Sequence, residues 1–149
     1  MSKLNLDHLI ASAVAEVLET MFFSEILGDG QPDLSCTALE AHVAFTGNSS
    51  GTVDVQISEA AARSLTASFL GESEESLSGL QLAHLVCELT NMLCGCIVSK
   101  MSAQGCFNLG SPELIEQPHH ESDECIEIQR SFAIERGTLT VSLASSEFA

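Results

Sequence analysis

The chain has 149 residues, 45% of them hydrophobic, and a formal net charge of −16 from 21 acidic and five basic side chains. Its length favours a single domain over residues 1–149, and its composition is that of a globular protein. Because this negative field repels phosphate backbones and anionic lipids, we expect neither a nucleic acid nor a membrane as partner. No secretory signal segment and no uncharged apolar stretch of roughly 18 residues is evident. We therefore expect a cytoplasmic protein with reduced cysteines.

The first half of the chain predicts a helix followed by a β-hairpin. Apolar residues recur at three- and four-residue steps over residues 6–26, which is the pattern of an amphipathic helix. A loop containing Gly and Pro ends this helix. Strand-like runs follow at 39–45 and 52–57, and apolar and polar residues alternate in the second run.

A short helix is predicted over 59–70, with Ser58 as its N-cap and Gly71 as its end. An acidic, Ser-rich linker occupies 72–78. The same plan then recurs as a long helix and two further strands, predicted over 79–101, 125–134 and 138–143.

The two halves align with each other. Glu16 and Glu19 match Glu88 and Asn91 at one offset (88 − 16 = 72 and 91 − 19 = 72), and the glycine-led strands match at another (137 − 51 = 86). We interpret this as two pseudo-repeats, about 6–71 and 79–144. They predict an α+β fold, a two-layer α/β sandwich with a mainly antiparallel sheet and the long helices on one face. The alternative is a chance match between two amphipathic helices.

The helix predicted over 79–101 has one apolar face and one polar line. The apolar face is expected to comprise Leu82, Leu85, Val86, Leu89, Leu93, Cys96 and Ile97. A flank of small residues suited to close packing comprises Ala83, Cys87, Thr90 and Cys94. Opposite the apolar face, His84, Glu88, Asn91 and Gly95 stand at i, i+4, i+7 and i+11, and we call this line the polar ridge.

Such a ridge is usually a solvated face, and that interpretation stays open. The residue choice points elsewhere, because Asn is a poor helix former and Gly95 costs about 1 kcal/mol relative to Ala. An amide beside a carboxylate can hold a water and pair with a cation. This combination suits hydrolysis of an acyl phosphate, which requires little beyond positioning of an in-line water.

The segment Glu88-Leu-Thr-Asn91-Met-Leu-Cys-Gly95 resembles the Glu-x-x-Asn-(Met/Ile)-(Leu/Ile)-x-Gly signature of the CheX/CheC/FliY chemotaxis phosphatases. Val17-Leu-Glu-Thr-Met21 and Gly51-Thr-Val53 are also similar to CheX. The resemblance covers essentially the whole chain and fits the single-domain CheX branch.

This resemblance implies a protein aspartyl-phosphate phosphatase acting on a phosphorylated CheY-like response regulator. Asn91 would orient the hydrolytic water, and Glu88 would pair with the regulator's active-site lysine. Gly95 would allow close packing, with His84 and Met92 as further partner-binding residues. Mg²⁺ would come with the regulator, so this chain is expected to bind no cofactor or metal of its own. The resemblance also implies a homodimer.

The first half departs from the signature. Glu19 stands where the family has Asn, and Phe23 (95 − 72 = 23) stands where it has Gly. A carboxylate repels phosphate and a phenyl ring blocks close approach, so we expect one active helix per chain.

Two other signals are given less weight. Cys87, Cys94 and Cys96 lack the spacing of a zinc knuckle, and core packing accounts for them. His119 and His120 stand in an acidic loop that is expected to be solvated. Two alternatives to a phosphatase remain: a non-catalytic receiver-binding module of the same fold, and a scaffold dimer whose ridge is only solvated.

Overall fold

The computed structural model describes residues 3–101, 105–115 and 126–145. Within these ranges the chain forms three α-helices, one 3₁₀ turn and seven strands. The helical segments are α1 (Lys3–Phe22), α2 (Glu59–Leu70), the 3₁₀ turn η1 (Glu74–Ser76) and α3 (Gly79–Met101). The strands are β1 (Gly28–Asp29), β2 (Leu39–Gly47), β3 (Gly51–Ile57), β4 (Phe107–Leu109), β5 (Glu113–Leu114), β6 (Ile126–Ile134) and β7 (Gly137–Ser145).

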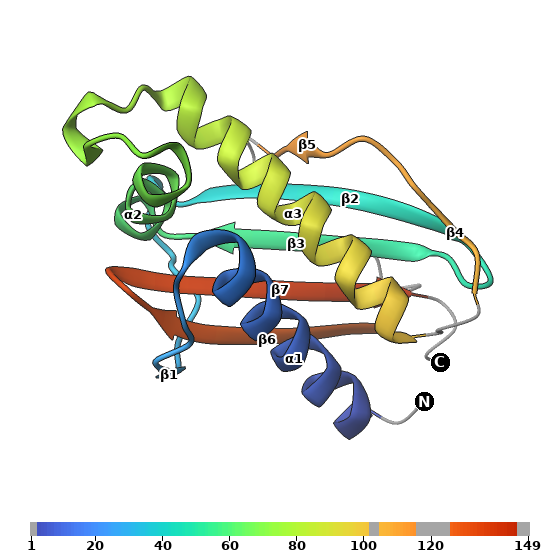
Figure 1. The fold of residues 1–149 in the computed structure, drawn as a ribbon. Helices are drawn as coiled ribbons and strands as arrows, with labels where there is room; N and C mark the ends of the chain where they lie inside the picture. Colours follow the sequence, from blue (N-terminus) through green and yellow to red (C-terminus); the bar gives the residue numbers. More distant parts are fainter. Residues whose placement is uncertain (1–2, 102–104, 116–125, 146–149) are drawn as a thin grey trace.

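The strands form one sheet in the order β1-β6-β7-β3-β2-β4, with β5 also pairing with β2. Every pairing is antiparallel. Figure 1 shows α1 and α3 lying side by side across one face of this sheet, with α2 at one end. The predicted α+β sandwich, with helices on one face of a mainly antiparallel sheet, is confirmed.

The core lies between the helices and the sheet. Alternate residues of the central strands face the helices and are fully buried, among them Val53 and Val55 of β3 and Val141 of β7. Leu89 and Leu93 of α3 meet them with no exposed surface. Burying a Val or Leu side chain contributes roughly 1.5–3 kcal/mol, so this seam fixes which face of α3 points inward.

The two hairpins meet at the centre of the sheet in a symmetrical way. Strands β3 and β7 pair so that Val55 lies opposite Val141. These two positions are related by the 86-residue offset of the sequence alignment (141 − 55 = 86). Above them, α3 packs on β2 and β3, whereas α1 packs on β6. Each long helix therefore covers the hairpin of the other half.

The first helix ends earlier than predicted, at Phe22 rather than residue 26. Phe23 adopts a left-handed backbone conformation with a φ of 53°. The Ser24 amide then donates to the Leu18 carbonyl at 3.0 Å. A non-glycine residue at positive φ stops helix propagation, and nothing in the sequence signals it.

Ser58 is the N-cap residue of α2, as predicted, although its side chain makes no capping bond there. Its Oγ instead accepts a hydrogen bond from the Thr138 amide at 3.1 Å, which ties α2 to β7. The short strands β1, β4 and β5 were not predicted, and the linker at 72–78 contains the turn η1.

One helix among the described residues, α3, is long and apolar enough to cross a membrane by length and composition alone. Half of the most apolar stretch of this helix is buried inside the fold. The core helix of a globular protein has the same composition, and packing against β2, β3 and the other helices accounts for it here.

Candidate functional site

The long helix α3 is fixed at its start by a reciprocal cap. The Ser78 amide donates to Gln81 Oε1 at 2.8 Å, and the Gln81 amide donates to Ser78 Oγ at 3.2 Å. This is a capping box, which satisfies two helix donors that would otherwise lack partners. The helix then runs without interruption to Met101. Its polar ridge is therefore carried on a rigid element.

The predicted ridge lies on the outer face of α3. His84 and Glu88 are exposed, and Asn91 and Gly95 are half-buried. In the part of the chain that the structure describes, the side chains of His84, Glu88 and Asn91 make no hydrogen bond or ion pair. Met92 is half-buried and packs against the core, so it lies beside the ridge rather than on it. The polar atoms of the ridge are open to an incoming group.

The neighbours of Gly95 do not require a glycine. A Cβ built at this position has only the Leu109 Cδ2 atom within 4 Å, at 3.9 Å, which is ordinary van der Waals contact. The backbone of Gly95 is helical, so positive φ does not explain it either. A glycine inside a helix costs about 1 kcal/mol relative to alanine, and the packing of the described residues does not explain why a glycine is present here.

The corresponding part of α1 is used differently. Glu16 Oε2 accepts a hydrogen bond from Cys96 Sγ at 2.9 Å and lies 3.3 Å from Lys100 Nζ. The hydrogen bonds from Cys96 and Lys100, and then the charge of Lys100, lower the pKa of Glu16. This contact joins α1 to α3. It also corrects the expectation for Cys96, which is half-buried at the helix–helix contact rather than part of the core.

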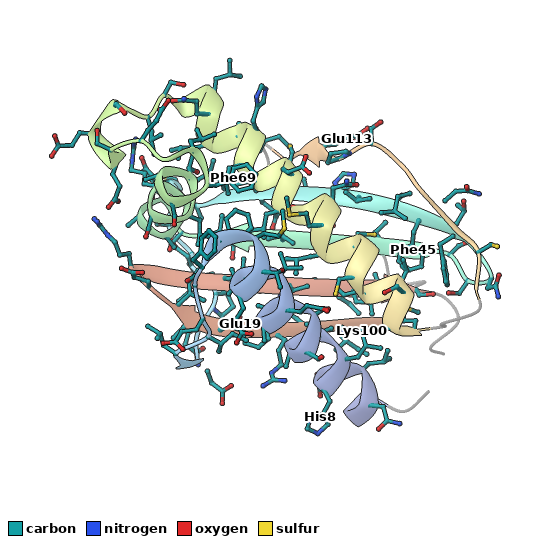
Figure 2. All side chains as sticks on the ribbon, viewed as in Figure 1. His8, Glu19, Phe45, Phe69, Lys100 and Glu113 are labelled. Atoms are coloured by element: carbon teal, nitrogen blue, oxygen red, sulfur yellow. The ribbon has the colours of Figure 1, made fainter. Side chains whose placement is uncertain are left out.

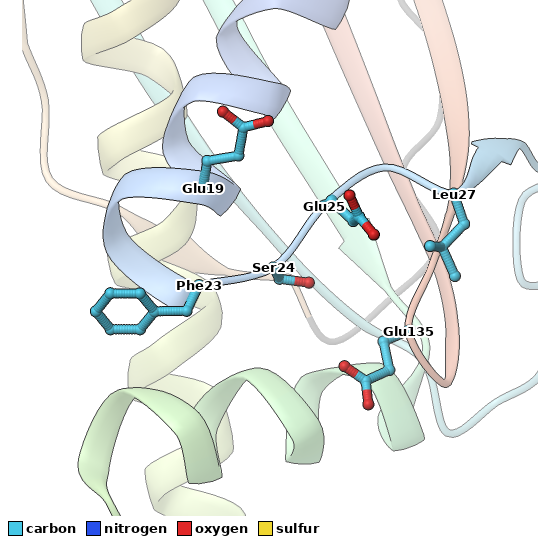
Figure 3. A pocket seen from close by; sticks show the side chains of 6 residues that line it. All are labelled: Glu19, Phe23, Ser24, Glu25, Leu27 and Glu135. Atoms are coloured by element: carbon cyan, nitrogen blue, oxygen red, sulfur yellow. The ribbon is translucent and has the colours of Figure 1, made fainter.

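At the end of α1 lies an open, acidic hollow of about 420 Å³ (Figure 3). Glu19, Glu25 and Glu135 contribute carboxylates to its lining. Phe23 is 86% exposed, and in Figure 3 its ring points away from Glu25 and Glu135. Three carboxylates without a cation among the lining residues would repel phosphate.

A second hollow, also of about 420 Å³, lies between α2 and α3 beside the ridge, and we call it the α2–α3 groove. Figure 2 labels Phe69 in α2, beside the first half of α3. The groove is lined by Thr66, Phe69, Leu70, Gln81, His84, Leu85 and Glu88. The sequence did not predict this groove. The only sequence signal was the apolar pair Phe69 and Leu70 next to the helix-ending Gly71.

The three cysteines of α3 differ in how deeply they are buried. Cys94 is fully buried, and burial raises the pKa of its thiol to about 12. Burial also raises the pKa of the Cys87 thiol. Among the described residues, no group of three His, Cys, Asp or Glu side chains is arranged to hold a metal ion. His119 and His120 lie outside the described residues.

The fold is an α+β sandwich in which α3 carries an exposed polar ridge on its outer face. Residues 39–133 match the family of the chemotaxis phosphatase CheX, and the chain belongs to this family. No curated protein sequence matches the chain.

Solved structures share the fold over nearly the whole chain. The chain is similar to the chemotaxis protein CheX from Vibrio vulnificus, with 19% identity and a TM-score of 0.73, covering 96% of this chain and 97% of that one. It is also similar to CheX from Desulfovibrio desulfuricans, with 22% identity, a TM-score of 0.72, and 93% and 97% covered. A third structure is the CheX–CheY–BeF₃–Mg²⁺ complex from Borrelia burgdorferi, with 17% identity, a TM-score of 0.69, and 93% and 95% covered.

Proposed function

We propose that this protein is a response-regulator aspartyl-phosphate phosphatase, with a phosphorylated CheY-like response regulator as its substrate. The main support for this proposal is the ridge of α3. There the Glu88 carboxylate and the Asn91 amide have no hydrogen-bond or ion-pair partner among the described residues, and they lie near Gly95, which internal packing does not require to be a glycine. Membership of the CheX family supports the reaction class. The related Borrelia structure, a CheX–CheY complex, supports the class of partner.

In this proposal the side chains of α3 position the water and the regulator, and the regulator supplies the reacting groups. The aspartyl phosphate and its Mg²⁺ belong to the substrate. The Asn91 carboxamide has no site that titrates near neutral pH, so it acts by donating and accepting hydrogen bonds that aim a water at phosphorus. That water forms the new P–O bond, and the aspartate carboxylate of the regulator leaves. Glu88 pairs with the regulator's lysine, and Gly95 admits its backbone.

Only one helix per chain is proposed to be active. Glu16, the counterpart of Glu88, already contacts Cys96 and Lys100. Glu19, the counterpart of Asn91, has a carboxylate in place of the amide and lines the acidic hollow. A cytoplasmic location follows from the nature of the substrate. A homodimer is also proposed, from family resemblance.

The second candidate is a module that binds the receiver without hydrolysis. The open α2–α3 groove beside Glu88 favours binding, and it does not require catalysis. The two functions differ in their dependence on Asn91. A catalyst requires the amide, whereas a docking module depends mainly on Glu88 and Gly95.

The deciding experiment follows decay of an acyl-phosphorylated CheY-like receiver in Mg²⁺, with and without this protein. We expect multiple-turnover acceleration that Asn91→Ala reduces roughly 100-fold or more, because a positioned hydrogen-bonding group acts mainly in the transition state. Glu19→Ala, at the corresponding position of α1, is the matched control and should hydrolyse at the parent rate. Acceleration that survives Asn91→Ala would contradict the role of Asn91, and binding without acceleration would favour the docking module.

A further inference from the structure

The α2–α3 groove and the polar ridge form one continuous surface. His84 and Glu88 belong to both, since they line the groove and stand on the ridge. On the far side of the groove, Phe69 and Leu70 of α2 remain 42% and 45% exposed. Large apolar side chains gathered beside a polar site are typical of an interaction surface.

We propose that this groove receives an apolar side chain of the phosphorylated response regulator and forms the second part of the docking surface. This inference rests on the function proposed above and extends it from α3 to α2. The ridge then provides the groups that position the water and pair with the lysine, while the groove provides apolar contact area.

The wall of the groove is held in place before any partner arrives. The Phe69 ring packs against the Phe22 ring of α1 with centroids 5.3 Å apart. Gly71 ends α2 in a left-handed conformation with a φ of 68°, and the Gly71 and Glu72 amides both donate to the Ala67 carbonyl. A pre-formed apolar wall loses little conformational entropy on binding, which favours its use in recognition.

The charge of the groove determines which type of residue is favoured next to that apolar side chain on the regulator. Among the described residues that line it, Glu88 alone has a fixed charge, and none is a lysine or arginine. Glu72 adds a second carboxylate, which accepts a hydrogen bond from Gln81 Nε2 at 3.3 Å. The occupant is therefore an apolar side chain beside a lysine or arginine. The active-site lysine that we pair with Glu88 provides such a cation on the regulator.

The test places a charge in the groove without touching the ridge. Leu70→Glu changes an exposed residue at the end of α2, and Phe69→Ala is a second variant that enlarges the groove. Leu34→Glu is the matched control, because Leu34 is 93% exposed in the loop before β2. Affinity is measured for a CheY-type receiver loaded with BeF₃⁻ and Mg²⁺, and steady-state hydrolysis is measured with the phosphorylated receiver.

We expect Leu70→Glu to raise Kd and KM about tenfold, which is the effect of losing one well-placed interface side chain. The value of kcat should stay unchanged. Phe69→Ala should shift Kd in the same direction, and Leu34→Glu should not. Parent-like Kd for both groove variants, while the parent binds and hydrolyses, would overturn this inference and leave the proposed function standing. A parent protein that neither binds nor hydrolyses would overturn both.

Discussion

Cys96 Sγ donates a hydrogen bond to Glu16 Oε2 over 2.9 Å and thereby joins α3 to α1. Glu16 is the residue of the first half that aligns with Glu88 of the second (88 − 16 = 72). The two carboxylates have different roles in the fold. Glu16 contacts a thiol and an ammonium group of α3 at the surface, while Glu88 has no hydrogen-bond or ion-pair partner among the described residues. The asymmetry between the two halves is therefore visible in what each carboxylate contacts.

Neutralising Glu88 should weaken substrate binding. Glu88→Gln keeps the shape of the side chain but removes the charge that we pair with a lysine, so KM for the phosphorylated receiver should rise about tenfold at low salt. The difference between parent and variant should shrink as ionic strength increases, because exposed charges are screened. Glu16→Gln removes the corresponding charge on α1 and should leave KM unchanged. Equal KM values for Glu88→Gln and the parent would contradict the pairing.

Gly95→Ala should stabilise the free protein and weaken binding. The site has room for a methyl group, and alanine is favoured over glycine by about 1 kcal/mol inside a helix. Urea denaturation should show this gain in the free energy of unfolding, while affinity for the BeF₃⁻-loaded receiver should fall. Gly79→Ala is the matched control, because a Cβ at Gly79 meets nothing within 4 Å. It should leave the affinity unchanged. If Gly95→Ala left the affinity unchanged, a second backbone would not approach here.

The thiol of Cys96 should react slowly until Glu16 is neutralised. Burial, then the hydrogen bond and charge of Glu16, raise the pKa of Cys96 from its ordinary value of 9.0 to about 11. Because this pKa is raised in the folded state, its contribution to stability is present below pH 9 and is lost as pH rises through about 11.

Glu16→Gln should therefore lower the pKa of Cys96 and speed its alkylation by iodoacetamide at pH 8.5, as followed by peptide mass spectrometry. Cys94 provides an internal control. Burial alone raises its pKa to about 12, so it should stay unreactive in both proteins. An unchanged rate at Cys96 would mean that its contact with Glu16 does not govern the thiol.

Relieving the strained end of α1 should stabilise the protein. Phe23 has a φ of 53° and is 86% exposed, so its ring contributes little packing against the cost of its backbone conformation. Phe23→Gly should raise the free energy of unfolding by about 1 kcal/mol. Phe23→Ala removes the ring but retains the left-handed strain, and should give no such gain. If both variants behaved alike in urea denaturation, the backbone conformation would not be the cause.

The sequence predicted those elements whose ends carry a local signal. The predicted bounds of 59–70 and 79–101 agree with α2 and α3, because Gly71 and the residues around Ser78 mark where those helices end and begin. The periodicity of a helix also predicted correctly that Glu88 and Asn91 lie on the outer face of α3.

The features that the sequence did not predict depend on distant parts of the chain. Strands β1 and β5 have two residues each and exist through pairing with β6 and β2, so they carry no alternating pattern of their own. The α2–α3 groove depends on how the two helices dock, and the contact of Glu16 with Cys96 joins residues 80 positions apart.

The pairing of β3 with β7 has a consequence for how the protein is made. The middle of the sheet joins the hairpin strand that ends at Ile57 to one that begins at Gly137. On a growing chain, β3 is synthesised long before β7, and its inner edge has no partner in the meantime. An unpaired strand edge is a template for misassociation. The sheet can therefore be completed only after β7 has been synthesised, and the high negative charge of the chain favours solubility until then.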